Sequence, residues 1–262
     1  MTHRLAAVYA HPDDDTYGLS GTYALNQGNL ALTVVVASSG EAGPIADPSL
    51  ATRESLAEIR EREERAALAA VGADGADVHF LRFPDGGLAD APHEELVESI
   101  TRVLREARPQ VVVTFGPEGI TRHPDHITVG QATTEAFHNL QAEAGNDAFQ
   151  RLLYTALPQS AVDRFFELMR ASNPDFGDPD DPFIPRGVPD HTITVRVDCS
   201  PVRDRKIAAL TEHRTQVQEF EAFPRELRDE VFGVEWFVQA WPPVTDPGGQ
   251  ALSSIFQGLD QA

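Results

Sequence analysis

Two clusters of imidazole and carboxylate side chains carry the strongest chemical signal in this sequence. The first is His11-Pro12-Asp13-Asp14-Asp15 and the second is His123-Pro124-Asp125-His126. Histidine nitrogens and carboxylate oxygens are the ligands of catalytic zinc sites, which use three protein ligands and leave one position open for water. Either cluster alone is typical of a solvated turn or of a helix start. Brought together by the fold, the two clusters predict a metal site.

The spacing within the clusters suggests which side chains would hold the metal. His11 and Asp14 are three residues apart at an expected strand-to-helix turn, so both can point at one ion. His126 lies where a later helix is expected to begin, and it would complete the set of three ligands. Asp13 would then lie beside the metal without binding it, in position to accept a proton from the attacking water.

The two remaining members of the second cluster are assigned supporting catalytic roles. His123 precedes His126 by about one helical turn, which leaves it free to stabilise a developing oxyanion or to protonate a leaving amine. Asp125 is expected to hold the His123 imidazole in one protonation state or tautomer.

Alternating strand-like and helix-like segments surround these clusters. Apolar runs rich in β-branched residues predict buried strands, and the amphipathic stretches between them predict helices. This alternation predicts an α/β fold with a Rossmann-like, mostly parallel sheet flanked by helices. The predicted strands are 5–10, 31–37, 78–83, 111–115, 152–157 and 192–197, and the predicted helices are 51–71, 92–107, 127–144 and 202–220.

The pattern is clearer in the first part of the chain than in the second. Residues 1–150 are predicted to form a Rossmann-like metal-binding core, and residues 151–262 a smaller C-terminal αβ extension that completes the same domain. Within the extension, residues 173–189 are dense in Pro, Asp and Gly and predict a long loop. No firm structure is assigned to the Pro- and Gly-rich tail from Pro242 onward.

Ligands of parallel sheets bind beyond the carboxyl ends of the strands. The loops that follow the first four predicted strands begin near His11, Ser38, Pro84 and Gly116. We therefore expect these four loops to line the site.

Composition limits the partners of the protein. The net charge of −20 and the pI near 4.7 disfavour nucleic acid and anionic membranes as partners. The sequence shows no run of eighteen apolar residues and no N-terminal signal pattern, so a cytoplasmic location is expected. Cys199 is the only cysteine and is expected to be a small core residue. A homo-oligomer is left open.

The two clusters resemble the signature of the LmbE-like, or PIG-L-type, family of zinc N-deacetylases. This family includes N-acetylglucosaminyl-phosphatidylinositol de-N-acetylase and the deacetylase and amidase of mycothiol metabolism. The resemblance extends over about residues 5–218. It implies Zn²⁺ bound by His11, Asp14 and His126, with Asp13 as the general base, and a small N-acylated substrate such as an amino sugar or glycoside.

The resemblance also implies substrate-binding roles for Arg60 and Asp85. His213 is expected to reach the rim of the site and to bind substrate there. The residues themselves allow other roles: a solvated salt bridge for Arg60, a turn favoured by the backbone for Asp85, and packing or capping for His213. His213 belongs to a segment from Lys206 to Gln216 that resembles the C-terminal signature of the family. The chain departs from the family pattern at Asp15, where glutamate is common.

The favoured function is hydrolysis that removes an N-acetyl or other N-acyl group from a small amino-sugar-like substrate. An amidase acting on a thiol or thioether conjugate fits the same motifs. A Mg²⁺-dependent phosphoryl-transfer protein would use hard oxygen ligands and a lysine near the phosphate, but the only lysine, Lys206, lies far along the chain. A binding module without catalysis is a further alternative, against which the presence of Asp13 argues.

Overall fold

A single mixed β-sheet organises the chain. The computed structural model describes residues 2–145, 147–173, 176–177, 184–216, 232–246 and 248–259. Seven strands lie in the order β3-β2-β1-β4-β5-β7-β6. β1 to β5 are parallel to their neighbours, and β7 is antiparallel to both β5 and β6. The strands are β1 His3–Tyr9, β2 Leu30–Val36, β3 Asp77–Phe80, β4 Val111–Phe115, β5 Arg151–Thr155, β6 Val195–Asp198 and β7 Val234–Trp241.

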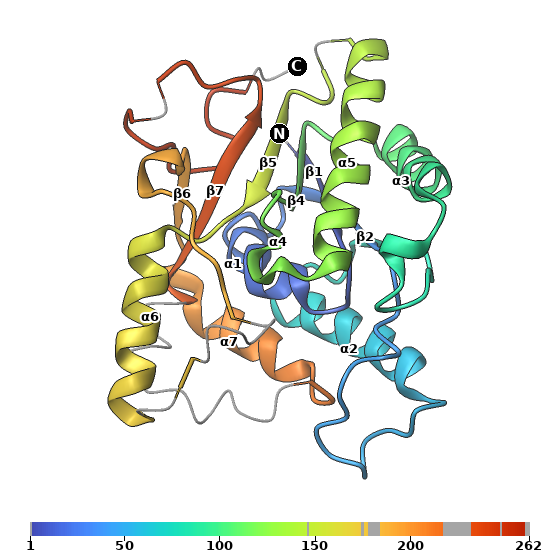
Figure 1. Ribbon diagram of the computed structural model, residues 1–262. Coiled ribbons are helices and arrows are strands. Elements are labelled where there is room, and N and C mark those ends of the chain that lie inside the picture. The colour runs from blue at the N-terminus through green and yellow to red at the C-terminus, as the bar shows by residue number, and fades with distance from the viewer. Residues whose placement is uncertain are drawn as a thin grey trace.

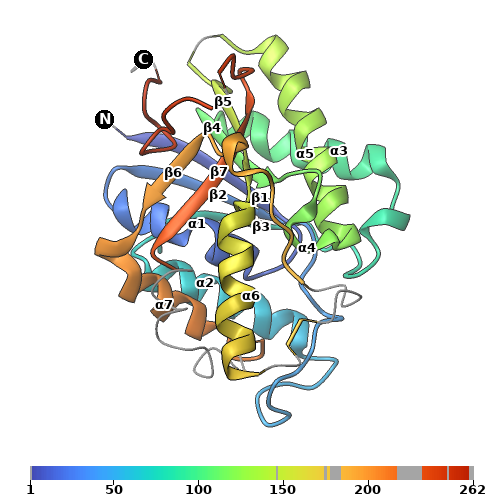
Figure 2. The ribbon, with the colours of Figure 1, turned by 60° about the vertical axis from the view of Figure 1, so that its left-hand side comes forward.

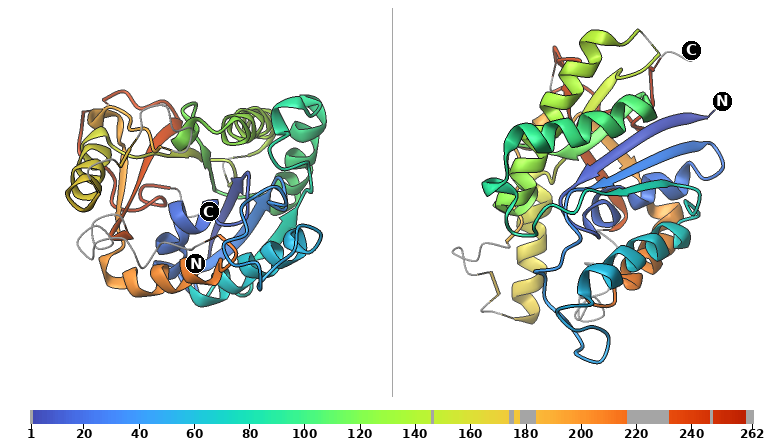
Figure 3. Two further views of the ribbon diagram at one scale, coloured as in Figure 1. Left: turned by 60° about the horizontal axis from the view of Figure 1, so that its bottom comes forward. Right: turned by 90° about the vertical axis from the view of Figure 1, so that its right-hand side faces the viewer.

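Helices cover both faces of the sheet (Figure 1). α3 and α5 lie on one face, and α1, α2 and α7 lie on the other, as the side view in Figure 3 shows. The helices are α1 Asp14–Leu25, α2 Leu56–Ala70, α3 His93–Ala107, α4 Gly119–Arg122, α5 Pro124–Glu143, α6 Gln159–Ser172 and α7 Arg203–Glu212, with 3-10 turns at Leu88–Asp90, Asp190–Thr192 and Ser200–Val202. No helix of the described segments combines the length and the apolarity needed to span a membrane. The cytoplasmic location stays a prediction.

The central strands are buried because helices cover them from both sides. All five residues of β4 are buried, and so are the last five residues of β1. A strand covered on both faces reads as a continuous apolar run, which is the pattern that made these strands predictable. The predicted α/β class and mostly parallel sheet are confirmed.

The order of the strands places a topological switch point between β1 and β4. The chain runs outward from β1 through β2 to β3, and then returns to the other side of β1 to form β4 and β5. At such a reversal the loops after the two central strands separate and leave room for a ligand. The loops after β1 and β4 flank this point, and they carry the two clusters of imidazoles and carboxylates.

The C-terminal part differs from the sequence-based prediction. Helix α6 and strand β7 were not predicted. Figure 2 shows β7 beside β6, which is the last strand at one edge of the sheet. The helix predicted at 202–220 ends at Glu212, and residues 217–220 lie outside the described residues. It ends there because His213 adopts a non-helical backbone conformation.

The loop predicted at 173–189 and the tail after Pro242 are described in part. Residues 174–175 and 178–183 of the loop lie outside the described residues. In the tail, Ile255 is buried in the core. The Arg151 guanidinium donates hydrogen bonds to the carbonyl oxygens of Ile255 (2.6 Å) and Gln257 (3.0 Å). The tail is therefore docked on the sheet.

Candidate active site

Three side chains from the loops after β1 and β4 place ligand atoms around one point. His11 Nδ1 lies 3.3 Å from His126 Nε2 and 3.5 Å from Asp14 Oδ2, and His126 Nε2 lies 3.4 Å from Asp14 Oδ1. A tetrahedral zinc with bonds of about 2.0–2.1 Å separates its ligand atoms by about 3.3 Å. Each of the three side chains is 11% exposed, so the point is partly buried but reachable. We call these residues the metal triad, because they can hold one metal ion.

Neighbouring groups orient the triad. His126 donates from Nδ1 to the Gly119 carbonyl oxygen at 2.9 Å, and its ring stacks on Phe115 with centroids 4.0 Å apart. This arrangement leaves the Nε2 lone pair directed at the ion position. Asp14 accepts a hydrogen bond from the backbone N–H of His11 at 2.8 Å. Although burial opposes it, the imidazoles of His126 and His11 hold the pKa of the Asp14 carboxyl well below its usual range.

The second nitrogen of His11 is held by carboxylates. His11 Nε2 lies 3.0 Å from Asp85 Oδ1 and 3.3 Å from Asp125 Oδ2. Asp125 is fully buried and also accepts hydrogen bonds from the backbone N–H groups of Gly86 (2.7 Å) and Leu88 (3.1 Å). A carboxylate on the far nitrogen of a ligating histidine fixes its tautomer and orientation.

This geometry changes the role predicted for Asp125. Its carboxylate was predicted to hold His123, whereas its hydrogen bonds go to His11 and to the loop after β3. The contact with His123 comes from the backbone, since Asp125 N–H donates to His123 Nδ1 at 3.2 Å and caps α5. The difference arises because the loop after β3 reaches Asp125, which the sequence pattern does not reveal.

His123 is oriented as a hydrogen-bond donor. Its Nδ1 accepts from a backbone N–H, so the proton of the neutral ring is on Nε2. Its ring centroid lies 4.9 Å from those of both His11 and His126. Burial and the two neighbouring imidazoles lower the pKa of His123. The ring therefore borders the triad as a neutral imidazole.

Asp13 lies beside the triad in a strained backbone conformation. Its φ of 112° is in a region that non-glycine residues rarely adopt, and such strain is concentrated at functional sites. Its N–H donates to Glu64 Oε2 at 3.2 Å, and Arg60 Nη2 donates to its Oδ2 at 3.1 Å. Burial raises the pKa of Asp13 to about 7, although the Arg60 guanidinium favours the charged form.

The three side chains predicted to bind substrate all contact the protein itself. Arg60 is buried and donates to the carbonyl oxygens of Pro12 and Gly40 as well as to Asp13. Asp85 contacts His11 and accepts from the Ala42 N–H at 2.8 Å. Direct contact of Arg60 or Asp85 with substrate stays a prediction.

The prediction that His213 reaches the rim of the site is wrong. Its side chain is 0% exposed, and its Nε2 lies 3.0 Å from the Thr16 hydroxyl. Burial lowers the pKa of His213 to about 3. The segment after α7 packs inward because the Thr215 N–H and hydroxyl both donate to Glu63, at 2.9 and 2.6 Å.

Two glutamates of α2 that were not predicted as site residues support the site. Glu64 accepts the Asp13 N–H, and Glu63 holds Thr215. Arg60, Glu63 and Glu64 have the i, i+3, i+4 spacing that places side chains on one helix face. That spacing was a usable signal, but the abundance of charge made the whole helix resemble a solvated one.

Asp15, the position that departs from the family pattern, is buried beneath the site. It accepts a hydrogen bond from the Tyr23 hydroxyl at 3.0 Å and shares a second hydrogen bond with Glu64. Burial and the charge of Asp15 raise the pKa of Glu64 well above its usual value. Although its side chain is shorter than that of glutamate, Asp15 therefore still reaches two hydrogen-bond partners, Tyr23 and Glu64, in the core.

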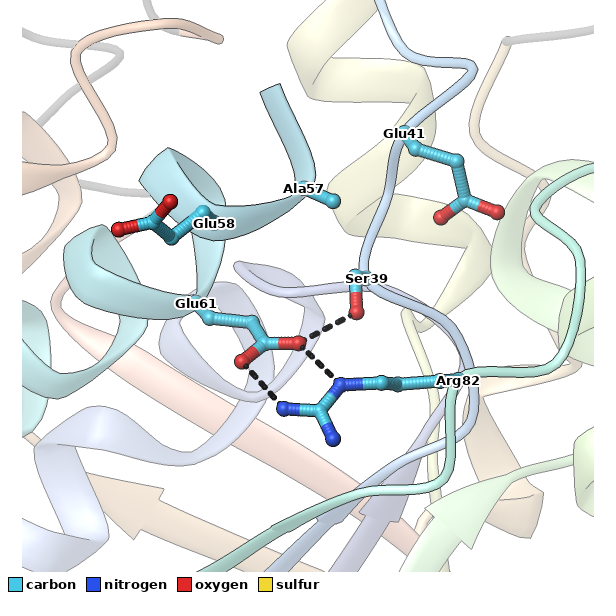
Figure 4. A pocket seen from close by; sticks show the side chains of 6 residues that line it. All are labelled: Ser39, Glu41, Ala57, Glu58, Glu61 and Arg82. Carbon is cyan, nitrogen blue, oxygen red and sulfur yellow. Dashed lines mark hydrogen bonds and ion pairs between the residues drawn. The ribbon is translucent and has the colours of Figure 1, made fainter. Parts of the chain in front are cut away.

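The loops after β2 and β3 are tied to α2 and to each other. Glu61 accepts hydrogen bonds from the Ser39 hydroxyl at 2.7 Å and from the Arg82 guanidinium at 2.9 and 3.0 Å (Figure 4). These residues border a cavity of about 320 Å³. Glu41 accepts the Asp85 N–H at 2.9 Å. These contacts position Asp85 against His11.

Comparisons with known proteins agree with this geometry. Residues 6–137 match the family described as PIG-L: GlcNAc-PI de-N-acetylase. A protein of Acidothermus cellulolyticus, named 1D-myo-inositol 2-acetamido-2-deoxy-alpha-D-glucopyranoside deacetylase, is 30% identical over 287 residues, covering 99% of this chain and 96% of the relative.

Solved structures show the same fold. A conserved protein from Thermus thermophilus aligns with a TM-score of 0.63 at 25% identity, covering 95% of this chain and all of that one. The N,N'-diacetylchitobiose deacetylase of Pyrococcus horikoshii aligns with a TM-score of 0.60 at 21% identity, covering 90% and 82%. The family match, the relative that spans nearly the whole chain and the metal triad lead to one conclusion: the chain belongs to the PIG-L family of de-N-acetylases.

Proposed function

We propose that this protein is a zinc-dependent N-deacetylase that hydrolyses the acetamido group of an amino-sugar glycoside. One observation carries the proposal: the ligand atoms of His11, Asp14 and His126 lie 3.3–3.5 Å apart, and the Asp13 carboxylate is close enough to interact with the charges of His11 and Asp14. Two imidazoles and one carboxylate form a donor set of catalytic zinc sites. Zinc bound here would polarise the acetyl carbonyl and lower the pKa of a water molecule.

Asp13 acts as the general base. Arg60 and Glu64 hold its side chain and its backbone, so the carboxylate is oriented before substrate binds. It takes a proton from the water that attacks the acetyl carbon. The same proton then passes to the departing nitrogen, which gives acetate and a free amine.

His123 stabilises the charge that develops on the carbonyl oxygen. The proton of its neutral ring is on Nε2 because Nδ1 accepts the Asp125 N–H. A donor that is oriented in advance stabilises an oxyanion without reorganisation during the reaction. The neutral state favoured by burial and by the neighbouring imidazoles suits a hydrogen-bond donor.

The names of the similar proteins support an amino-sugar substrate. The relative from Acidothermus cellulolyticus is named for an inositol glycoside of an acetamido sugar, and the Pyrococcus horikoshii enzyme for N,N'-diacetylchitobiose. Both names describe an acetamido sugar joined to a second ring. A thiol or thioether conjugate hydrolysed by the same chemistry remains the second candidate.

The phosphoryl-transfer alternative needs an accessible lysine near the phosphate, and this chain does not offer one. Lys206, the only lysine, is 1% exposed and is paired with Glu235 at 2.6 Å. It is therefore closed off from any substrate. The nitrogen-rich triad also suits zinc better than Mg²⁺, which prefers oxygen ligands.

A substrate panel tests the proposal. Purified, zinc-loaded protein is mixed with the inositol glycoside of N-acetylglucosamine and with N,N'-diacetylchitobiose. A third substrate is a thioether of N-acetylcysteine that is joined through an amide bond to the nitrogen of an amino-sugar glycoside. Free primary amine and acetate are measured together. Equal release of both from the acetamido sugars is expected. Release of neither from any sugar, by protein with stoichiometric zinc, would overturn the proposal, and cleavage of the conjugate alone would favour the second candidate.

A further inference from the structure

The backbone of α4 is strained. Gly119, Ile120 and Arg122 have φ values of 60°, 59° and 60°. Ile120 combines its φ with a ψ of −52°, which is close to the γ-turn with positive φ, a rare and strained conformation. Because Ile120 is β-branched, this conformation is a clear outlier. We call residues 119–122 the α4 turn.

The α4 turn folds back onto the helix that carries a metal ligand. The Gly119 carbonyl oxygen accepts the hydrogen bond from His126 Nδ1 at 2.9 Å, although the two residues are seven positions apart. The fit is close, since a β-carbon at position 119 would lie 3.1 Å from the His126 Cβ and 2.9 Å from the Ile127 Cγ1. The kink at Ile120 therefore brings this carbonyl group to the imidazole while α5 still begins at Pro124.

A second segment holds the α4 turn from another direction. The Arg186 N–H donates to the Ile120 carbonyl oxygen at 2.6 Å. Residues 186–188, which we call the brace, belong to the long loop predicted before β6. The brace is itself fixed, because the Val188 N–H donates to the Leu157 carbonyl oxygen and the Val188 carbonyl oxygen accepts the first N–H of α6, both at 2.8 Å.

The brace leaves little room for movement at its centre. A β-carbon at Gly187 would lie 2.6 Å from the Gln159 Cα at the start of α6. Backbone strain at a non-glycine residue persists only where the surrounding structure imposes it. The hydrogen bonds of Ile120 with Arg186 and of Gly119 with His126 impose it here.

We propose that the α4 turn and its brace are positioning elements that set the zinc affinity from outside the ligand set. The partner of the second nitrogen of a ligating histidine fixes the tautomer and the orientation of the ring. The strain at Ile120 is the conformational cost of placing that partner, the Gly119 carbonyl group. The inference rests on the proposed zinc-dependent function for the identity of the metal. Since linkage is reciprocal, zinc binding must in turn stabilise the turn and the brace.

The first test displaces the carbonyl group. Gly119→Ala should lower zinc affinity about 10- to 100-fold in chelator competition and should alter the visible spectrum of the Co²⁺-loaded protein, because His126 is pushed from its position. Gly28→Ala is the matched control: Gly28 also has a positive φ, of 80°, but a β-carbon there meets nothing within 4 Å. The control should lose stability and keep both the zinc affinity and the spectrum. Wild-type affinity in Gly119→Ala, or an equal loss in Gly28→Ala, would overturn the inference.

The second test acts through the brace alone. Gly187→Ala forces the brace away from α6 and should lower zinc affinity about fivefold, a smaller effect than that of a direct partner of the ligand. Gly75→Ala, where a β-carbon also meets nothing within 4 Å, is its control and should bind zinc like wild type. Wild-type zinc affinity in Gly187→Ala would remove the brace from the inference.

The third test uses the unmodified protein. Zinc should slow hydrogen exchange of the Arg186 amide about tenfold more than that of the Phe149 amide, which donates to the Pro109 carbonyl oxygen away from the site. Equal slowing of both amides would contradict the coupling. If these dependences are observed in a protein that hydrolyses no acetamido sugar, the proposed function fails and the positioning role stands. If the protein is an active deacetylase but Gly119→Ala and Gly187→Ala bind zinc like wild type, the positioning role fails alone.

Discussion

Two buried clusters of charged side chains contact helix α1, and they differ in how completely their polar atoms are paired. The lysine cluster consists of Lys206, Glu235 and Thr22. Glu235 accepts hydrogen bonds from Lys206 Nζ (2.6 Å), from the N–H groups of Gly21 (2.8 Å) and Thr22 (3.0 Å), and from the Thr22 hydroxyl (2.6 Å). Lys206 and Glu235 are each 1% exposed. The metal triad, of which Asp14 is the first residue of α1 and His126 belongs to α5, instead directs imidazole nitrogens and a carboxylate at one shared, accessible point.

This contrast assigns a structural role to the lysine cluster and a chemical role to the metal triad. A buried charge whose partners are complete is closed to any further ligand, and its loss leaves the partner uncompensated. Two imidazole nitrogens and a carboxylate that converge on one point can hold a metal ion and, through it, bind substrate. Lys206 and the triad both belong to stretches that resemble family signatures, yet only the triad lies where substrate can reach it.

Removing a triad member gives the largest expected effect. His126→Ala should lose stoichiometric zinc and all measurable hydrolysis, because two ligands remain and catalytic zinc sites use three. Metal content after dialysis, measured by mass spectrometry, checks this. Full zinc occupancy in the variant would show that another residue is the third ligand.

Changing the base should separate metal binding from turnover. Asp13→Asn removes the proton acceptor and is expected to lower kcat about 10³-fold while zinc stays bound. Asp74→Asn, an exposed aspartate outside the site, serves as the control. A wild-type kcat in Asp13→Asn protein would mean that the base is misassigned.

Breaking the lysine cluster should lower the stability of the fold without affecting the metal site. Lys206→Met leaves the Glu235 carboxylate buried without its cation, and we expect a loss of about 3 kcal/mol in the free energy of unfolding. Urea denaturation measures this loss, and the zinc content per folded molecule should not change. A stability within about 0.5 kcal/mol of wild type would contradict the structural role of this cluster.

The carboxylate behind His11 should have a smaller effect on the metal. Asp125→Asn keeps the shape of the side chain but weakens its hold on His11 Nε2, so zinc affinity should fall about 10- to 100-fold. Competition with a zinc chelator gives the affinity. An unchanged affinity would show that the Asp85 carboxylate alone is enough to fix His11 Nε2.

The smallest effect concerns the pH dependence of stability. The pKa of His213 is lowered to about 3 by burial, so the unfolded chain binds a proton that the folded protein excludes. Stability from this group is complete above the unfolded pKa of about 6.5 and is lost as the pH falls below it. Between pH 7.5 and 5.5, wild type should lose about 1.4 kcal/mol more than His213→Gln. Urea unfolding of both proteins at both pH values measures this difference. Equal losses of stability in wild type and His213→Gln would contradict the effect of burial on the pKa of His213.

The first part of the fold and the metal triad were predictable because their signals are local. Buried parallel strands such as β1 and β4 read as continuous apolar runs, and each is followed directly by its cluster of imidazoles and carboxylates. Parallel strands end at the same edge of a sheet, so the convergence of His11, Asp14 and His126 follows from the chain order. The assignment of Asp13 as the base stays a prediction.

Burial and partner choice were decided by the tertiary structure. The residue pattern predicts the α/β alternation and the residues that meet beyond β1 and β4. It did not reveal that β7 returns antiparallel beside β5, that Asp125 faces His11, or that His213 is buried against Thr16. Each of these contacts joins residues far apart in the chain, and spacing along a helix or strand carries no information about which distant surface will cover it.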